Sequence, residues 1–290
     1  MVSSLNSKIR SVTKCRSRDN PFDIRDQRAM ISLGAFSKYR HCPYSCPFCY
    51  VQTDFLSYPN FKISEIIEWL NKQPIDSFDI IYVSGDTDSF AAPRTDQALL
   101  LLEKLLTLGK DVLFTTRMVM DKSKLNRLSA IVENYRKESL KIFGCVSIAQ
   151  HTVPHLEPAP IASPLERITQ LHRFKELGLM SILTVRPFLP VVPLSDYEWI
   201  LKESLNNVHA VLGEVWYTDC EGVLESKVLG VGKKLEKFSL AKMPFDDNEK
   251  IWKVYHAENI QEFFRNWCLK AGLPFFMRSR PAIEWIRKNV

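Results

Sequence analysis

The residues best suited to chemistry are three cysteines with the spacing Cys-x3-Cys-x2-Cys, at Cys42, Cys46 and Cys49. Three thiolates can bind three irons of a 4Fe–4S cubane and leave the fourth iron open to a ligand that is not protein. A structural zinc site instead has four protein ligands and is closed. The incomplete set of thiolates therefore predicts a reactive metal site. The alternative is a zinc knuckle that takes His41 or a distant histidine as its fourth ligand, although adjacent residues rarely reach one tetrahedral metal together.

Further polar groups follow later apolar runs of the chain and could bind a small molecule. One such group is the segment Ser84, Gly85, Asp86, Thr87 and Asp88. Gly85 lets a ligand approach the backbone, and the two carboxylates suit an ammonium partner. Arg117 follows the next run, and its guanidinium is shaped for a bidentate contact with a carboxylate. Each has a plainer interpretation, which is a polar turn for the first segment and an ion pair with a neighbouring acid for Arg117.

The elements that must position these residues alternate between short apolar runs and helical patterns. We expect strands at 30–36, 79–84, 111–116, 141–149, 180–186 and 209–217, and helices near 64–72, 95–108, 122–136, 163–177 and 195–205. Capping boxes at Ser163–Glu166 and Ser195–Glu198 predict two of the helix starts. Strands separated by crossover helices pair in parallel. The pattern predicts an α/β fold, a partial barrel of six strand–helix units with its chemistry at the carboxyl ends of the strands.

The composition is that of an ordinary globular protein, with 46% hydrophobic and 25% charged residues among 290. The seven cysteines are an odd number, and four of them are far apart, so a disulfide framework is not expected. No apolar run is long enough to span a membrane, and the first residues lack a signal-peptide core, so we expect a cytoplasmic protein.

Three regions are expected along the chain: a basic N-terminal segment at 1–29, the barrel core at 30–217, and a C-terminal extension at 218–290 packed on the barrel. In the extension we expect helices at 251–254, 260–269 and 281–288 and a strand at 273–277. The net charge of +6 is concentrated at the two ends of the chain. Such basic ends can neutralise phosphates, and they can equally be solvated termini.

The cysteine spacing resembles that of the radical S-adenosylmethionine (radical SAM) enzymes. The later segments Asp86-Thr-Asp-Ser-Phe-x-x-Pro93, Thr115-Thr-Arg117, Ser147 and Leu156-Glu-Pro with Arg167 are similar to those of the spore photoproduct lyase branch. This resemblance covers roughly residues 30–195. It implies a radical SAM barrel, a 4Fe–4S cluster and S-adenosylmethionine (SAM) as cofactors, and a one-electron donor such as flavodoxin or ferredoxin. It also implies that SAM is cleaved to a 5′-deoxyadenosyl radical, which abstracts a hydrogen from the substrate.

By this resemblance, the three cysteines of the loop bind the cluster, and the other site residues bind SAM. Phe48 is expected near the adenine, and Tyr50 matches a catalytic tyrosine of the branch. The remaining residues implied to bind SAM are Ser84, Gly85, Asp86, Thr87, Asp88, Arg117 and Ser147. The resemblance assigns no role to Glu157 or Arg167, and Glu157 is expected to cap or pair structurally.

The chain departs from the lyase pattern at two places. It has Ser84-Gly85 where the branch has a cysteine that donates hydrogen, and Phe48 where the branch has a tyrosine. Cys145 is a substitute donor, because it lies two residues before Ser147 and should face the same side of the strand. A free cysteine in a strand can also be a simple core residue.

Three functions are therefore considered. The first is a radical SAM, lyase-like enzyme that acts on nucleic acid, and the second is a radical SAM enzyme that acts on a peptide or small metabolite. The third is a zinc-stabilised binding module.

Overall fold

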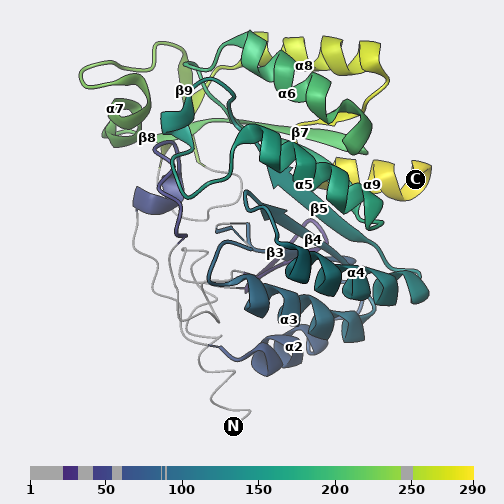
Figure 1. The fold of residues 1–290 in the computed structure, drawn as a ribbon. Helices are drawn as coiled ribbons and strands as arrows, with labels where there is room; N and C mark the ends of the chain where they lie inside the picture. The colour runs from purple at the N-terminus through teal and green to yellow at the C-terminus, as the bar shows by residue number, and fades with distance from the viewer. Residues whose placement is uncertain (1–21, 32–41, 54–60, 86, 89, 243–250) are drawn as a thin grey trace.

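The main element of the structure is a curved, mostly parallel sheet. The computed structural model describes residues 22–31, 42–53, 61–85, 87–88, 90–242 and 251–290. Within these residues the sheet has eight strands in the order β1-β2-β3-β4-β5-β6-β7-β11 (Figure 1). They are β1 (Phe22–Arg25), β2 (Arg28–Ile31), β3 (Ile80–Val83), β4 (Asp111–Thr116), β5 (Ile142–Ser147), β6 (Met180–Phe188), β7 (Ala210–Val215) and β11 (Phe275–Phe276). β1 and β2 are antiparallel, and the neighbours from β2 onward are parallel.

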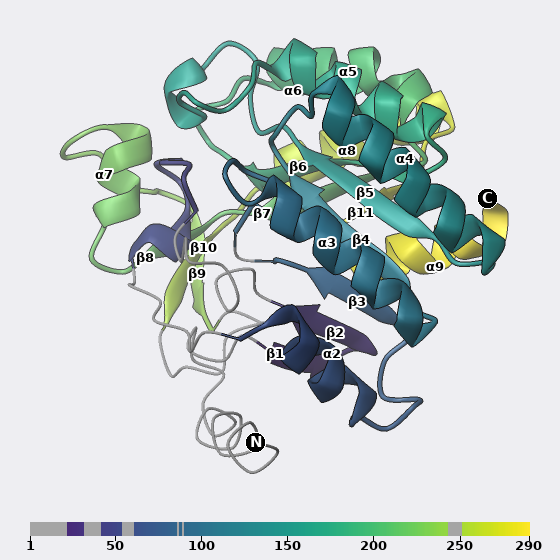
Figure 2. The same cartoon turned by 60° about the horizontal axis from the view of Figure 1, so that its bottom comes forward.

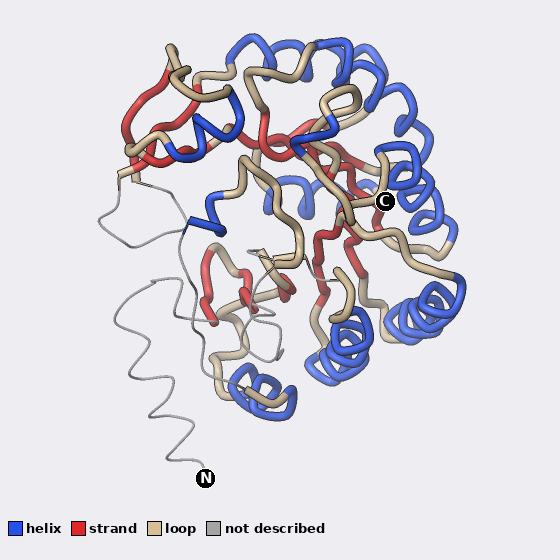
Figure 3. The backbone as a smooth tube through the Cα atoms, turned by 60° about the vertical axis from the view of Figure 1, so that its left-hand side comes forward, coloured by secondary structure: helices blue, strands red, loops and turns tan. Residues whose placement is uncertain are grey.

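The crossover helices cover the outer face of this sheet, as Figures 2 and 3 show. They are α2 (Ile63–Asn71), α3 (Thr95–Leu105), α4 (Lys122–Lys137), α5 (Pro164–Glu176) and α6 (Leu194–Ser204). Alternate strand residues face opposite sides, so Ile81 and Val83 of β3 belong to the core beneath the helices, while Ile80 and Tyr82 belong to a second cluster on the concave side. The predicted partial (β/α)6 barrel is thereby confirmed.

The concave side is filled by the last helix, α9 (Ser279–Asn289). Its apolar residues Ala282, Ile283 and Ile286 are buried against the concave strand residues. Basic side chains fix the helix at the amino ends of the strands: Arg280 and Arg287 both pair with Asp79, and Arg287 Nε donates to Asp111 Oδ2 over 2.8 Å. The C-terminal extension therefore contributes to the barrel itself, and β11 also adds a strand to the sheet beside β7.

A second, small sheet has the order β8-β10-β9, formed by β8 (Tyr217–Asp219), β10 (Trp252–Tyr255) and β9 (Phe238–Ala241). α7 (Val223–Leu229) lies beside it (Figure 1). The predicted helix at 251–254 is therefore wrong, because this segment pairs as a strand on both sides. A four-residue apolar run has no periodicity that separates a strand from a helix.

Most of the other predicted elements are confirmed to within a few residues, including α8 (Glu258–Ala271) and the capping box at Ser163 and Glu166. The second predicted cap is wrong, because α6 begins at Leu194 after Pro193, without a side-chain cap. The sheet also begins earlier than expected, since residues 22–31 form a hairpin that starts in the segment assigned to the basic N-terminus and ends in the expected barrel core. No helix among the described residues has the length and apolarity needed to cross a membrane.

Candidate active site

The carboxyl ends of the parallel strands surround one open pocket with about 160 Å³ of internal space. Eleven of the thirteen residues predicted for the site line this pocket. They are Cys42, Cys46, Phe48, Cys49, Tyr50, Ser84, Gly85, Thr87, Asp88, Arg117 and Ser147. Of the other two, Asp86 lies outside the described residues, and Cys145 is buried behind the pocket wall. Parallel strands end at one edge of their sheet, and this explains how residues far apart in sequence meet here.

The cysteine loop places its three thiols at one end of the pocket. A turn closes between Cys46 and Cys49, whose backbone N–H donates to the Cys46 carbonyl over 3.0 Å. Burial raises the pKa of the Cys46 thiol to about 12, opposed by the nearby charge of Arg117. Burial also raises the pKa of Cys42, reinforced by the carboxylate of Asp88. Thiols in such surroundings become ligands when a bound cation stabilises the thiolate.

This donor set fits an iron–sulfur cluster. Cys49 lies near enough to raise the pKa of Cys42 and of Cys46, and all three cysteines line the same pocket. Among the described residues, however, no three His, Cys, Asp or Glu side chains are grouped so as to hold a single metal ion. In a cubane each thiolate binds a different iron, so the sulfurs do not have to converge on one atom. His41, the alternative fourth ligand, lies outside the described residues.

Aromatic residues of the barrel and the small sheet hold the cysteine loop in place. The indole Nε1 of Trp216 donates to the carbonyl of Phe48 over 3.1 Å. The Phe48 ring is buried, with the Arg117 guanidinium 5.7 Å from its centroid. Tyr50 begins a 3-10 turn (Tyr50–Thr53), and its ring meets that of Trp252 edge-on at 5.9 Å. These contacts explain how a loop with little regular structure has a defined position.

The segment after β3 is a tightly bonded turn. The Ser84 hydroxyl donates to the Thr87 carbonyl over 2.7 Å and lies 2.6 Å from the Thr87 hydroxyl. Ser84 has a positive φ of 61°, which a residue with a side chain rarely adopts. A side chain at Gly85 would approach the end of Met30 to 3.1 Å, so glycine suits this close packing. Ser84 and Thr87 therefore form the polar turn that was the plainer interpretation of this segment. Both residues also line the pocket.

Asp88 links this turn to the end of β4. Its Oδ1 accepts from Phe90 N at 2.9 Å and from the Thr116 hydroxyl at 2.7 Å, and its Oδ2 accepts from Arg117 N. Burial raises the pKa of Asp88, while these hydrogen bonds act in the opposite direction. With three protein donors on its carboxylate, Asp88 is placed to orient Arg117 as well as to face a ligand.

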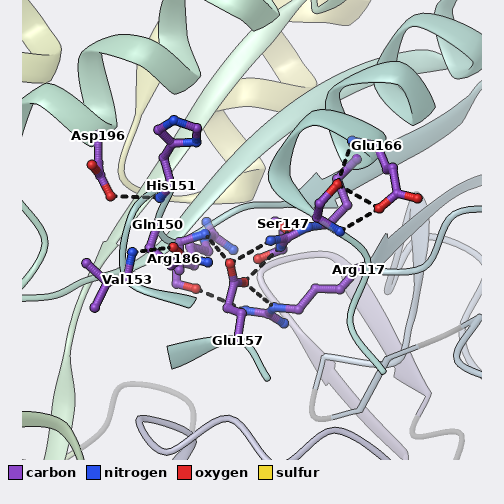
Figure 4. A network of polar contacts seen from close by, with 12 residues as sticks. Arg117, Ser147, Gln150, His151, Val153, Glu157, Glu166, Arg186 and Asp196 are labelled. Atoms are coloured by element: carbon purple, nitrogen blue, oxygen red, sulfur yellow. Dashed lines mark hydrogen bonds and ion pairs between the residues drawn. The ribbon is translucent and has the colours of Figure 1, made fainter. Parts of the chain in front are cut away.

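A buried ion-pair network fixes the side chain of Arg117 (Figure 4). Its Nε donates to Glu157 Oε1 over 3.0 Å, and its Nη2 donates to the carbonyl of Arg186 over 3.2 Å. Glu157 also accepts from both terminal nitrogens of Arg167, at 2.8 and 2.7 Å. Arg167 in turn donates to the carbonyl of Ser147 over 2.5 Å. Burial disfavours the Glu157 carboxylate, but the two arginines prevail and lower its pKa. The predicted alternative, an Arg117 ion pair, is therefore present.

The network joins two arginines to the carboxylate of Glu157, and the carboxylate of Asp88 lies beside the same Arg117. Within the described part of the chain, Arg117 donates from Nε and Nη2 and not from Nη1. The expected structural pairing of Glu157 is confirmed. The sequence did not indicate that this pairing positions Arg117. A glutamate that is buried between two arginines from distant segments is not marked by any residue spacing along the chain.

Cys145 is buried behind the pocket wall, next to residues that line the pocket. Cys145 is 1% exposed and pairs with Thr115 of the neighbouring strand. The Thr115 hydroxyl is 3.3 Å from the Tyr82 hydroxyl, and both residues line the pocket. Burial raises the pKa of the Cys145 thiol to about 12. The predicted orientation of Cys145 toward the concave side is confirmed, and Tyr82 is a pocket residue that the sequence did not single out.

Comparisons with known proteins agree with this architecture. A solved structure of a spore photoproduct lyase mutant with dinucleoside spore photoproduct superposes with a TM-score of 0.61, at 15% identity, over 82% of this chain and 74% of that chain. The chain has the fold of spore photoproduct lyase. A further mutant of the lyase, with bound AdoMet and dinucleoside spore photoproduct, gives a TM-score of 0.60 at 14% identity over the same shares of both chains.

The lyase itself with its dinucleoside photoproduct also gives 0.60 at 14% identity. No model of a protein family matches the sequence, and no curated protein matches it either. The likeness to spore photoproduct lyase is thus one of fold, with low sequence identity.

Proposed function

We propose that this protein is a radical SAM enzyme with lyase-like chemistry. The observation that carries the proposal is the convergence of Cys42, Cys46 and Cys49 with Arg117 in one pocket at the carboxyl ends of the strands. When bound by these cysteines, a 4Fe–4S cluster with SAM on its open iron supplies a 5′-deoxyadenosyl radical after one-electron reduction. A protein such as flavodoxin or ferredoxin would supply the electron.

The residues around the cysteines divide the binding of SAM between them. Arg117, held by Glu157 and Asp88, presents positive charge to the methionine carboxylate. The turn from Ser84 to Asp88 offers its oxygens to the amino group, and Phe48 offers a ring edge to the adenine. Ser147 completes the wall between Arg117 and β6.

Cys145 and Tyr50 are the proposed catalytic residues. At neutral pH a thiol with a pKa of about 12 keeps its proton, and a protonated thiol can donate a hydrogen atom whereas a thiolate cannot. Cys145 pairs across the sheet with Thr115, whose hydroxyl is 3.3 Å from the phenol of Tyr82 at the pocket. Tyr50 directly follows Cys49 and lines the pocket.

The proposed substrate is nucleic acid, because the solved relatives of this fold hold a dinucleoside photoproduct and the chain carries a net charge of +6. A peptide or small metabolite is the alternative. If the purified enzyme makes 5′-deoxyadenosine but has no affinity for DNA or RNA at low salt, this alternative replaces the first.

The decisive test is anaerobic reconstitution of the full chain followed by metal analysis and an assay of SAM cleavage. We expect iron with broad visible absorbance, and 5′-deoxyadenosine after addition of reductant. Single Cys42→Ala, Cys46→Ala and Cys49→Ala variants should lose both signals. Cys220→Ala is the matched control, since Cys220 is exposed and outside the pocket. Zinc without iron in the wild-type protein would identify a zinc-stabilised binding module instead.

A further inference from the structure

The side of the pocket formed by β6 and β7 carries polar groups that the roles proposed above do not use. Thr184 is 1% exposed, and its hydroxyl has no hydrogen-bond partner among the described residues. The buried Nε of Arg186 also lacks a hydrogen bond there. Both residues line the pocket, together with Glu214 of β7. Buried polar atoms nearly always have a hydrogen-bond partner in folded proteins. Two buried polar atoms without such a partner in one pocket wall therefore indicate a ligand.

A β-bulge aims Arg186 at this pocket. Val185 pairs with Gly213 and Phe188 with Val215, so β6 advances three residues while β7 advances two. The extra residue turns the strand locally, and bulges of this kind are common beside active sites because they redirect a side chain. The bulge is locked by packing, since a side chain at Gly213 would collide with the Phe188 ring.

The charges of this wall identify the kind of ligand. Arg186 Nε and Glu214 Oε2 are 3.9 Å apart, too far for a hydrogen bond, and the two side chains are 21% and 35% exposed. The pair presents N–H donors next to a carboxylate acceptor, with the Thr184 hydroxyl below. Its two charges cancel, so it has no preference for an anion. A neutral group with a carbonyl oxygen beside an N–H would satisfy both partners at once.

We infer that Thr184, Arg186 and Glu214 form a binding subsite for an amide or imide edge of the substrate. The carbonyl oxygen accepts from Arg186 and Thr184, and the N–H donates to Glu214. The inference deepens the proposed function, on which it rests for the statement that this ligand is the substrate. The same chemistry is present in a nucleobase and in a peptide amide.

Direct binding to the reconstituted full chain, without reductant, tests the inference. The probes are uracil for a nucleobase edge, N-acetylglycinamide for a peptide amide, and inorganic phosphate for an anion, each followed by ligand-observed NMR titration. At least one amide probe should bind more tightly than phosphate. Arg186→Met should weaken that binding at least about tenfold, equivalent to about 1.4 kcal/mol, and Thr184→Val and Glu214→Gln should each weaken it. Arg136→Met, at an exposed arginine of α4, is the matched control.

The amide probe that binds more tightly shows whether the amide edge of the substrate belongs to a nucleobase or to a peptide. The inference is overturned if neither amide binds the wild-type protein, if Arg186→Met or Thr184→Val binds as the wild type does, or if phosphate binds best and Glu214→Gln strengthens it. No SAM is cleaved in these titrations, so their failure leaves the test of SAM cleavage unaffected.

Discussion

The carboxylate of Glu157 lies between two guanidinium groups, 3.0 Å from Arg117 Nε and 2.7 Å from Arg167 Nη2. Arg167 and Glu157 have fully buried side chains, and Arg117 is 19% exposed at the pocket. One acid therefore holds two arginines in place, and through Arg167 it joins α5 to the ends of β4 and β5.

Replacing Glu157 should be costly for folding. Glu157→Gln removes the charge that balances two arginines, and breaking a buried pair in this way costs about 3 kcal/mol. We expect the free energy of unfolding in urea to fall by that order. Glu166→Gln is the control, since Glu166 is an exposed member of the capping box of α5, the helix that carries Arg167. Equal losses in the two variants would contradict the structural role of the Glu157 network.

Arg117 should affect SAM binding more than folding. Arg117→Met removes the positive charge proposed to meet the SAM carboxylate, so the Kd of reconstituted protein for SAM should rise at least about tenfold. Arg117→Lys should recover only part of the affinity, because an ammonium group lacks the planar fork. Equilibrium dialysis with labelled SAM measures this. An unchanged Kd for SAM in Arg117→Met would show that the SAM carboxylate binds to other residues.

The hydrogen bond from Trp216 to Phe48 should stabilise the cysteine loop. Trp216→Phe leaves the Phe48 carbonyl without its donor, at a cost of about 1 kcal/mol. We expect the variant to fold yet lose iron faster than the wild type when challenged with a chelator. Trp199→Phe, at a residue stacked on His151 away from the loop, is the control. Identical rates of iron loss in all three proteins would show that Trp216 does not hold the loop.

Acid should weaken the attachment of α9 at Asp79. Burial opposes the charge of Asp79, but Arg280 and Arg287 lower its pKa below the ordinary value. The unfolded chain therefore binds the proton more readily, so this stabilisation is complete above about pH 4 and is lost as the pH falls through the folded pKa. It should be modest, roughly 1 kcal/mol after screening, because Asp79 is 40% exposed.

Urea unfolding between pH 7 and pH 3 measures this effect. Asp79→Asn should lower stability at neutral pH and flatten its decline in acid. Asp76→Asn, in the exposed loop just before Asp79, should do neither. A decline as steep in Asp79→Asn as in the wild type would place the acid-sensitive group elsewhere.

Local sequence patterns predicted the site because its residues lie at or near the ends of parallel strands. Arg117 and Ser147 follow apolar runs, and the ends of parallel strands meet at one edge, so their proximity to the cysteine loop followed from strand order. The hairpin of β1 and β2 gave no such signal. Its two turn residues, Asp26 and Gln27, both have positive φ, and a turn of this kind is usually marked by glycine.

Other features depend on contacts between distant segments. Asp196, in the first turn of α6, accepts from the backbone of His151 and Thr152 rather than serving a cap at Ser195. The bulge at Arg186 likewise exists only through the pairing of β6 with β7. Neither follows from residue spacing along one segment.

The position of α9 in the chain also bears on how the protein is made. Among the described residues, the apolar concave surface of strands β2–β7 is covered by α9, at residues 279–289. A ribosome that adds about 5–20 residues per second needs several seconds to progress from β7 to α9. During that interval the apolar concave surface of the nascent barrel is exposed to water. We therefore expect chaperones to act at this stage of synthesis.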